Sequence, residues 1–196
     1  GCMVWPAIAQ PIITPWGNIK GMVVDGEKMY FETSVRSVKT DWSGCISSER
    51  CNWQGTQTYS FSGNTTNMSH FLQALPLYYS EQFTENGTNS VGVEVSVDAT
   101  AEIDQAGTYF CFELPGSEFM GGTIDLYSGK TKSGSARLES SVPAGKPEYL
   151  RKKGNKIIVK TGNREYEVTA DNISEIFVRQ NFIDRPGYLN DPLPAK

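Results

Sequence analysis

The segment Val91-Gly92-Val93-Glu94-Val95-Ser96-Val97-Asp98 alternates valine with small or polar residues over eight positions. Because successive side chains of a β-strand point to opposite faces of a sheet, a period of two places the four valines on one face. The segment therefore predicts a strand that is covered on one side only, as in a two-layered β-sandwich. Similar signals extend from it in both directions along the chain.

These other strand signals recur at intervals that are typical of sandwiches. The clearest is a hairpin in which Ile19–Val24 and Met29–Val38 flank Asp25-Gly26, a dipeptide that favours a two-residue turn because both of its positions need positive φ. Further strands are predicted over residues 56–62, 107–114, 123–127, 136–141, 156–160, 166–170 and 175–182. A second hairpin turn is predicted at 161–164.

Three segments carry less regular signals. Residues 69–83 fit a strand as well as they fit helical turns interrupted by Pro76, so both alternatives stay open. In the strand over 107–114, the face with Phe110 and Phe112 is the more apolar one, and we expect it to point into the core. Residues 39–55 are polar and are expected to form a long loop, a kind of segment that commonly carries function.

This pattern predicts an all-β protein, a β-sandwich of jelly-roll or super-sandwich type with roughly ten strands. Residues 1–16 contain Pro6, Pro11 and Pro15, so they can run only as an extended arm or an edge strand. The sandwich is expected over 17–183, followed by a C-terminal tail or linker over 184–196.

Composition and charge exclude several classes of function. The chain has 18 basic and 22 acidic residues among 196, and its net charge of -4 gives no electrostatic basis for binding nucleic acid. No apolar run reaches the roughly 20 residues that a transmembrane helix needs. We therefore expect no nucleic-acid partner and no transmembrane segment.

The cysteines bear on the compartment. Cys2 follows a small residue at the start of the chain, the pattern left when a lipoprotein signal is removed, so it is a candidate lipid anchor; the alternative is an ordinary residue in an N-terminal tail. Cys45 and Cys51 flank a polar loop and are predicted to form a local disulfide, the alternative being two thiols. Together they favour an exported protein that is extracellular, periplasmic or at the cell surface.

Residues for metal, cofactor or catalytic chemistry are few. With His70 as the only histidine, the sequence provides neither the usual Cys/His spacing of a zinc site nor a Ser-His-Asp triad, so we expect no metal, no cofactor and no catalytic residue. Asn-x-Ser/Thr acceptors, which would carry glycans only in a eukaryotic secreted protein, occur at Asn64, Asn67, Asn86 and Asn172.

Two tryptophans, Trp42 and Trp53, lie in the polar stretch 39–55. An exposed aromatic ring can stack on the apolar face of a sugar ring, so both are candidate carbohydrate-binding residues. The alternative is that each ring plugs an open end of the sandwich, because tryptophan is mostly buried in folded proteins.

One short segment resembles immunoglobulin variable-type domains. Asp104-Gln105-Ala106-Gly107-Thr108-Tyr109-Phe110-Cys111 is similar to their strand F signature, and Gly121–Leu126 is similar to the strand that follows. The resemblance implies a disulfide from Cys111 to a cysteine on an apolar strand, whereas Cys45 and Cys51 both have polar surroundings.

A second resemblance covers most of the first 130 residues. The segments Gly17–Ser34, Asp41–Ser43 and Gly107–Pro115 resemble the N-terminal β-sandwich of certain bacterial glycoside hydrolases. This resemblance implies that hydrolysis belongs to a separate barrel domain, and it transfers no catalytic residue to this chain. Glu102-Ile103-Asp104 is similar to the start of the acidic motif of jelly-roll β-glucanases, but Ala106 or Gly107 stands where the general acid would be.

The sequence thus leads to three hypotheses. The first is a non-catalytic, exported β-sandwich that supports or targets polysaccharide processing by binding a polysaccharide or glycan, as an accessory domain of a glycoside hydrolase. The second is an immunoglobulin-like cell-surface adhesion or receptor domain. The third is a glycoside hydrolase with an unrecognised carboxylate site, built from residues such as Glu32, Glu113 and Asp125.

Overall fold

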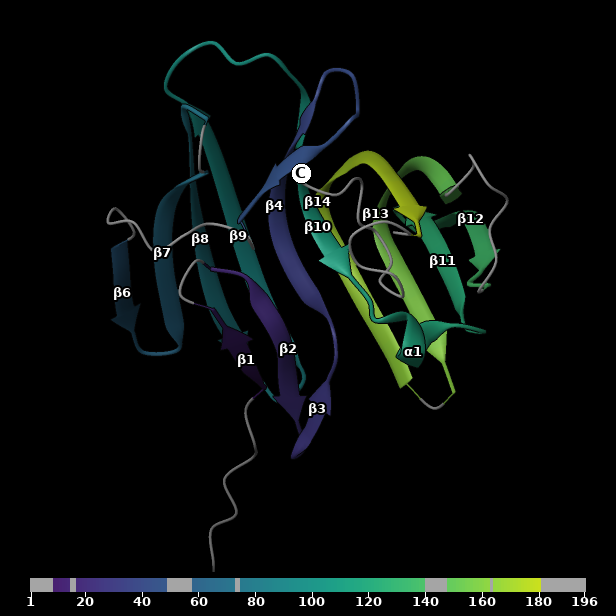
Figure 1. Ribbon diagram of the computed structural model, residues 1–196. Coiled ribbons are helices and arrows are strands. Elements are labelled where there is room, and N and C mark those ends of the chain that lie inside the picture. The colour runs from purple at the N-terminus through teal and green to yellow at the C-terminus, as the bar shows by residue number, and fades with distance from the viewer. Residues whose placement is uncertain are drawn as a thin grey trace, which may run out of the picture. The chain divides into compact units, whose positions relative to one another are not determined.

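The computed structural model describes residues 9–14, 17–48, 58–72, 75–139, 148–162 and 164–180. Within these residues the protein has fourteen strands in four sheets and one short helix, so the predicted all-β class is confirmed (Figure 1). Contacts divide the chain into two compact units, the first ending at Phe112 and the second beginning at Glu113. The predicted bounds 1–16, 17–183 and 184–196 stay a prediction.

The first unit contains three sheets. Their strand orders are β1-β2-β3, β10-β4-β5 and β6-β7-β8-β9. The strands of the two smaller sheets are β1 (Gln10–Ile13), β2 (Ile19–Val24), β3 (Glu27–Met29), β4 (Glu32–Lys39), β5 (Cys45–Ser47) and β10 (Gln105–Glu113). The four-stranded sheet consists of β6 (Thr58–Ser62), β7 (Thr65–Leu72), β8 (Leu77–Asn86) and β9 (Ser90–Ala99). The proline-containing β1 is an edge strand, one of the two forms predicted for its segment.

The second unit contains one sheet with the order β12-β11-β13-β14. Its elements are α1 (Gly116–Phe119), β11 (Thr123–Ser128), β12 (Thr131–Arg137), β13 (Glu148–Thr161) and β14 (Arg164–Arg179). One face is apolar and buried at Ile124, Leu126 and Val159. The buried ring of Phe119 in α1 meets Tyr166 of β14 edge to face, with 5.0 Å between ring centroids.

The hairpin predicted at Asp25-Gly26 is confirmed. These two residues have φ of 51° and 79°, and Val24 pairs with Glu27 across the turn. The following strand, predicted as continuous over Met29–Val38, is instead divided between β3 and β4, which belong to different sheets. At the break, the buried ring of Phe31 stacks on Phe112 with 4.8 Å between centroids.

The alternating valine segment forms β9, as predicted, and pairs along its whole length with β8. Its valine face is only partly covered, since Val97 is 38% exposed. Residues 69–83, for which strand and helix both stayed open, belong to β7 and β8. The second predicted hairpin is also confirmed, because Thr161 pairs with Arg164.

Other strand boundaries differ from prediction. The stretch expected to be a loop contains β5, whose three residues are too few to show an alternating pattern. The strand expected at 136–141 lies earlier, as β12. The strands expected at 166–170 and 175–182 belong to one strand, β14, in which residues 170–173 lie opposite Asn155 alone. This bulge explains why the sequence pattern breaks there.

The orientation predicted for residues 107–114 is confirmed at Leu114, which is 1% exposed, but it is wrong in the middle of β10. Cys111 and Glu113 are buried, whereas Phe110 on the opposite face is 42% exposed. Glu113 interacts with other groups, which allows a carboxylate to lie on the inner face.

A polar cluster joins the two three-stranded sheets of the first unit. Ser48 Oγ donates to Asn18 Oδ1 at 2.7 Å and accepts a hydrogen bond from Val35 N at 2.9 Å. Ile19 N donates to Thr33 Oγ1 at 3.0 Å. Since Asn18, Thr33 and Ser48 are buried, these hydrogen bonds satisfy polar groups that water does not reach.

We expect Ser48→Ala to lower the free energy of unfolding by about 1–3 kcal/mol, because it removes two buried hydrogen bonds. The change can be measured by urea denaturation. Ser90→Ala, at an exposed serine of the same unit, is the matched control. Equal effects of the two substitutions would contradict the structural role assigned to Ser48.

Candidate functional site

Side chains on one face of the sheet β6-β7-β8-β9, whose strands are labelled in Figure 1, form rows that run across the strands. Directly paired residues of antiparallel strands point to the same side, so the register defines each row. The middle row has only small hydroxyl side chains: Thr58, Ser69, Ser80 and Ser96. The row on one side of it holds Ser60, Asn67, Gln82 and Glu94, and the row on the other side holds Phe71, Tyr78 and Asp98.

Because the small side chains lie between two rows of longer ones, the face is hollowed across the strands. We call these three rows the hydroxyl trough. An open groove of about 640 Å³ follows it, and its lining includes all of the hydroxyl row, all of the amide-containing row and Tyr78. The lining also includes the paired residues between these two rows, whose side chains belong to the opposite face: Tyr59, Met68, Glu81 and Val95. At ~4.8 Å between neighbouring strands, the trough is roughly 14 Å long, enough for an extended ligand.

Polar groups in the trough are held by their neighbours. The hydroxyls of Thr58 and Ser69 are 2.6 Å apart, and Gln82 Nε2 donates to Asn67 Oδ1 at 2.7 Å. A hydroxyl can both donate and accept, and each amide keeps further capacity. The trough therefore offers donors and acceptors that are already oriented.

An aromatic pair forms one wall of the trough. Phe71 and Tyr78 lie directly opposite each other, with ring centroids 5.2 Å apart and planes at 69°. Phe71 is 40% exposed and Tyr78 lines the groove. The wall thus presents apolar ring surface beside a polar floor.

The charged side chains within the three rows of the trough have one sign. Between positions 51 and 129 the sequence contains no Lys or Arg, so its charged residues there are all Asp and Glu. Within the trough, the charged side chains are Glu94 and Asp98, both on β9. The surface therefore carries negative charge and no side-chain cation.

A buried carboxyl group lies behind the trough. Glu81 occupies the strand position between Ser80 and Gln82, so its side chain points to the opposite, inner face. It is 2% exposed, and neither carboxyl oxygen has a hydrogen-bond partner among the described residues. A side chain at Gly17, which has φ of 91°, would collide with this carboxyl group and with Met68.

Burial raises the pKa of the Glu81 carboxyl from 4.5 to about 8. Burial, followed by the nearby Glu81, also raises the pKa of Tyr59, and burial lowers the pKa of His70 on the same face. The folded protein therefore keeps Glu81 protonated at neutral pH. The unfolded chain releases this proton.

This linkage predicts that the free energy of unfolding falls as pH rises from 4.5 to about 8. Because the unfolded state binds fewer protons in this window, Glu81 contributes a loss of up to roughly 1.4 kcal/mol per pH unit. Glu81→Gln should remove this contribution. The free energy of unfolding of the variant, measured by urea denaturation, should therefore increase with pH relative to that of the unsubstituted protein. Glu102→Gln, at an exposed carboxylate, is the control; parallel profiles for the Glu81→Gln and unsubstituted proteins would disprove the linkage.

Trp42, a predicted sugar-binding residue, is half-buried at the turn between β4 and β5. Its ring centroid lies 6.3 Å from that of Tyr109. Its φ of 58° is uncommon for a residue other than glycine, and Trp42 N donates to Lys39 O at 2.9 Å within the turn. Trp53 lies outside the described residues. A sugar-binding role of either tryptophan stays a prediction.

Two of the four cysteines, Cys45 and Cys111, lie among the described residues. Cys45 and Cys111 are both buried and no disulfide joins them, and Arg36 Nη1 donates to Cys45 Sγ at 4.0 Å. Cys2 and Cys51 lie outside the described residues, so the lipid anchor and the Cys45–Cys51 disulfide stay predictions. The immunoglobulin-like pairing of Cys111 with Cys45 does not form.

The carboxylates considered for hydrolysis are each engaged separately. Glu32 lies 3.7 Å from Lys20 Nζ. Glu113 is buried and interacts with other groups. Burial raises the pKa of Asp125, but hydrogen bonds with Lys132 and Ser135 outweigh it and hold that pKa below its ordinary value. Asp125 thus lacks the raised pKa expected of a general acid at neutral pH.

The four glycosylation acceptors have different surroundings. Asn67 lies in the trough, where a glycan would fill the groove. Asn64, Asn86 and Asn172 are exposed. Asn64 Nδ2 donates to Glu85 O at 2.9 Å. Glycosylation at any of them stays a prediction.

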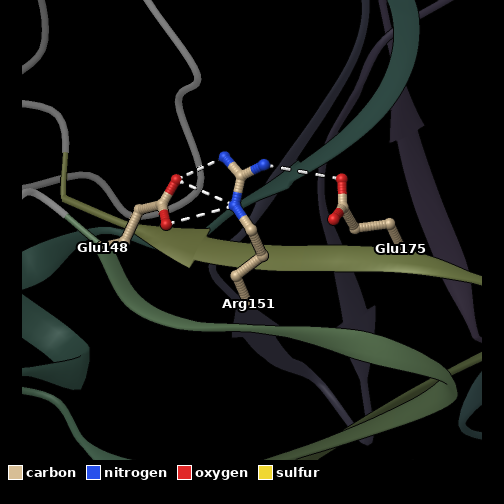
Figure 2. A network of polar contacts seen from close by, with 3 residues as sticks. All are labelled: Glu148, Arg151 and Glu175. Carbon is tan, nitrogen blue, oxygen red and sulfur yellow. Dashed lines mark hydrogen bonds and ion pairs between the residues drawn. The ribbon is translucent and has the colours of Figure 1, made fainter.

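In the second unit, the clearest polar cluster links two strands. Figure 2 shows Arg151 of β13 between Glu148 and Glu175. Arg151 Nε donates to both Glu148 oxygens at 3.1 Å, and its Nη1 lies 3.5 Å from Glu175 Oε2. The guanidinium group also lies 4.8 Å from the ring centroid of Phe177. Because these groups are solvent-exposed, the cluster makes a modest contribution to pairing of β13 with β14.

Comparison with protein-family models, with curated proteins and with solved structures gives no significant match. Over the described residues, no helix is long and apolar enough to span a membrane. The same part of the chain contains no group of three or more His, Cys, Asp and Glu side chains placed to hold a metal ion.

Proposed function

We propose that this protein is a non-catalytic, exported β-sandwich that binds a polysaccharide or glycan along the hydroxyl trough. The observation that carries the proposal is the groove of about 640 Å³ on the face of a four-stranded sheet, with a hydroxyl floor and an aromatic wall. In this role it would support or target polysaccharide processing, as accessory domains of glycoside hydrolases do. The site differs from the one predicted at Trp42 and Trp53.

The chemistry of a sugar matches both kinds of surface in the trough. Its hydroxyl groups donate and accept hydrogen bonds, as do Ser69, Ser80 and Gln82. Its C–H faces are apolar and can pack against aromatic rings such as Tyr78.

The shape of the trough favours an extended chain over a single compact ligand. It is open, and it crosses all four strands of the sheet. The polar floor belongs to paired strands, which keep its side chains in place without ligand. A rigid surface reduces the entropy lost on binding.

Screening on a polysaccharide array, followed by isothermal titration with the best ligand, tests the proposal. We expect Tyr78→Ala to weaken binding about two- to twelvefold, because it removes ring surface worth about 0.5–1.5 kcal/mol. Phe61→Ala is the matched control: Phe61 is 76% exposed on the opposite face of the same sheet. Binding to no polysaccharide, or equal losses in both variants, would reject the trough as a glycan site.

A further inference from the structure

The distribution of charge in the first unit narrows the class of ligand. Strands β6, β7, β8 and β9 contain no Lys or Arg, and their one histidine, His70, is buried on the inner face. Anionic polymers are bound mainly through Lys and Arg, which pair with carboxylate, sulfate or phosphate groups. The described side chains that line the trough offer no such pairing.

Two carboxylates in the trough would also repel an anionic ligand. Glu94 lies in the amide-containing row beside Gln82, and Asp98 lies in the aromatic row beside Tyr78. Both are exposed on β9, so they flank one end of the hydroxyl row at Ser96. A ligand that follows the groove onto β9 contacts the strand at Ser96, beside Glu94 in the groove lining and two residues from Asp98. Like charges brought together at a binding surface disfavour the complex.

We infer that the trough selects neutral glycans and rejects acidic ones, such as polymers of uronic acids or sulfated sugars. This inference rests on the proposed function and adds the substrate class. Hydroxyl and amide groups supply the attraction, and Glu94 and Asp98 supply the discrimination. Selection arises from an unfavourable contact with the wrong ligand as well as from favourable contacts with the right one.

A matched pair of ligands isolates the charge. The neutral polysaccharide that binds best on the array is compared with the same polysaccharide oxidised at C6, in which primary alcohols become carboxylates while the backbone is kept. We expect oxidation to weaken binding of the full chain on the order of tenfold at low salt. Added salt should reduce this difference, because both carboxylates are exposed to solvent.

Substitution of the two acids tests their role. In Glu94→Gln/Asp98→Asn, the difference between neutral and oxidised ligand should shrink severalfold, whereas Glu102→Gln, outside the trough, should leave it unchanged. Circular dichroism confirms that each variant is folded. An unchanged difference in the double variant would show that these acids do not discriminate.

The outcomes separate the two proposals. If the oxidised polymer binds as tightly as the neutral one, or if only acidic polysaccharides bind, the neutral specificity is wrong while glycan binding stands. If no polysaccharide of either kind binds, the proposed function itself fails.

Discussion

The antiparallel register of β7, β8 and β9 is the constraint on which the candidate site depends. Because side chains alternate between faces, a slip of one residue along β8 would turn Ser80 and Gln82 inward and bring Tyr79 and Phe83 to the surface. Tyr79 and Phe83 are almost completely buried, so such a slip would expose large apolar rings. The inner face of the strand thus fixes the composition of its outer face.

Strand β8 also carries a buried carboxyl group whose desolvation lowers the stability of the folded sheet. Glu81 lies among the inward residues of β8 and has no hydrogen-bond partner within the described structure. Its burial is tolerated in the protonated form, since a neutral carboxyl costs much less to desolvate than a carboxylate. The polar cluster around Ser48 shows the contrasting solution, in which buried polar groups are paired with one another. The first unit therefore combines satisfied and unsatisfied polar groups in one interior.

Local sequence signals predicted the strands better than they predicted the site. The valine alternation and the Asp25-Gly26 turn each depend on neighbouring residues, and both appear in the structure. Short strands such as β5 and the bulge within β14 were not predicted, because tertiary pairing and not local sequence pattern creates them. The orientation of β10 was predicted wrongly at Phe110 and Glu113, because the interactions of the buried Glu113 are not visible in the alternation of apolar residues.

The hydroxyl row could not be recognised from the sequence alone. Ser69, Ser80 and Ser96 are eleven and sixteen positions apart and carry no motif. Only the pairing of three strands places them side by side. By contrast, the aromatic residues of a polar stretch predicted a sugar-binding site at Trp42. The ring of Trp42 packs near Tyr109, at a turn where Trp42 has a positive φ. Spacing along the chain identifies such surfaces only when register is known.

The absence of Lys and Arg between positions 51 and 129 has a consequence for enzymatic digestion. Trypsin cuts after these two residues, so it has no cleavage point in any strand or turn of sheet β6-β7-β8-β9. A complete digest leaves this whole sheet on one long peptide, whether or not the sheet was folded. Survival of that peptide would therefore reflect amino-acid composition, and a protease that cuts after aromatic residues would be needed to report on local opening.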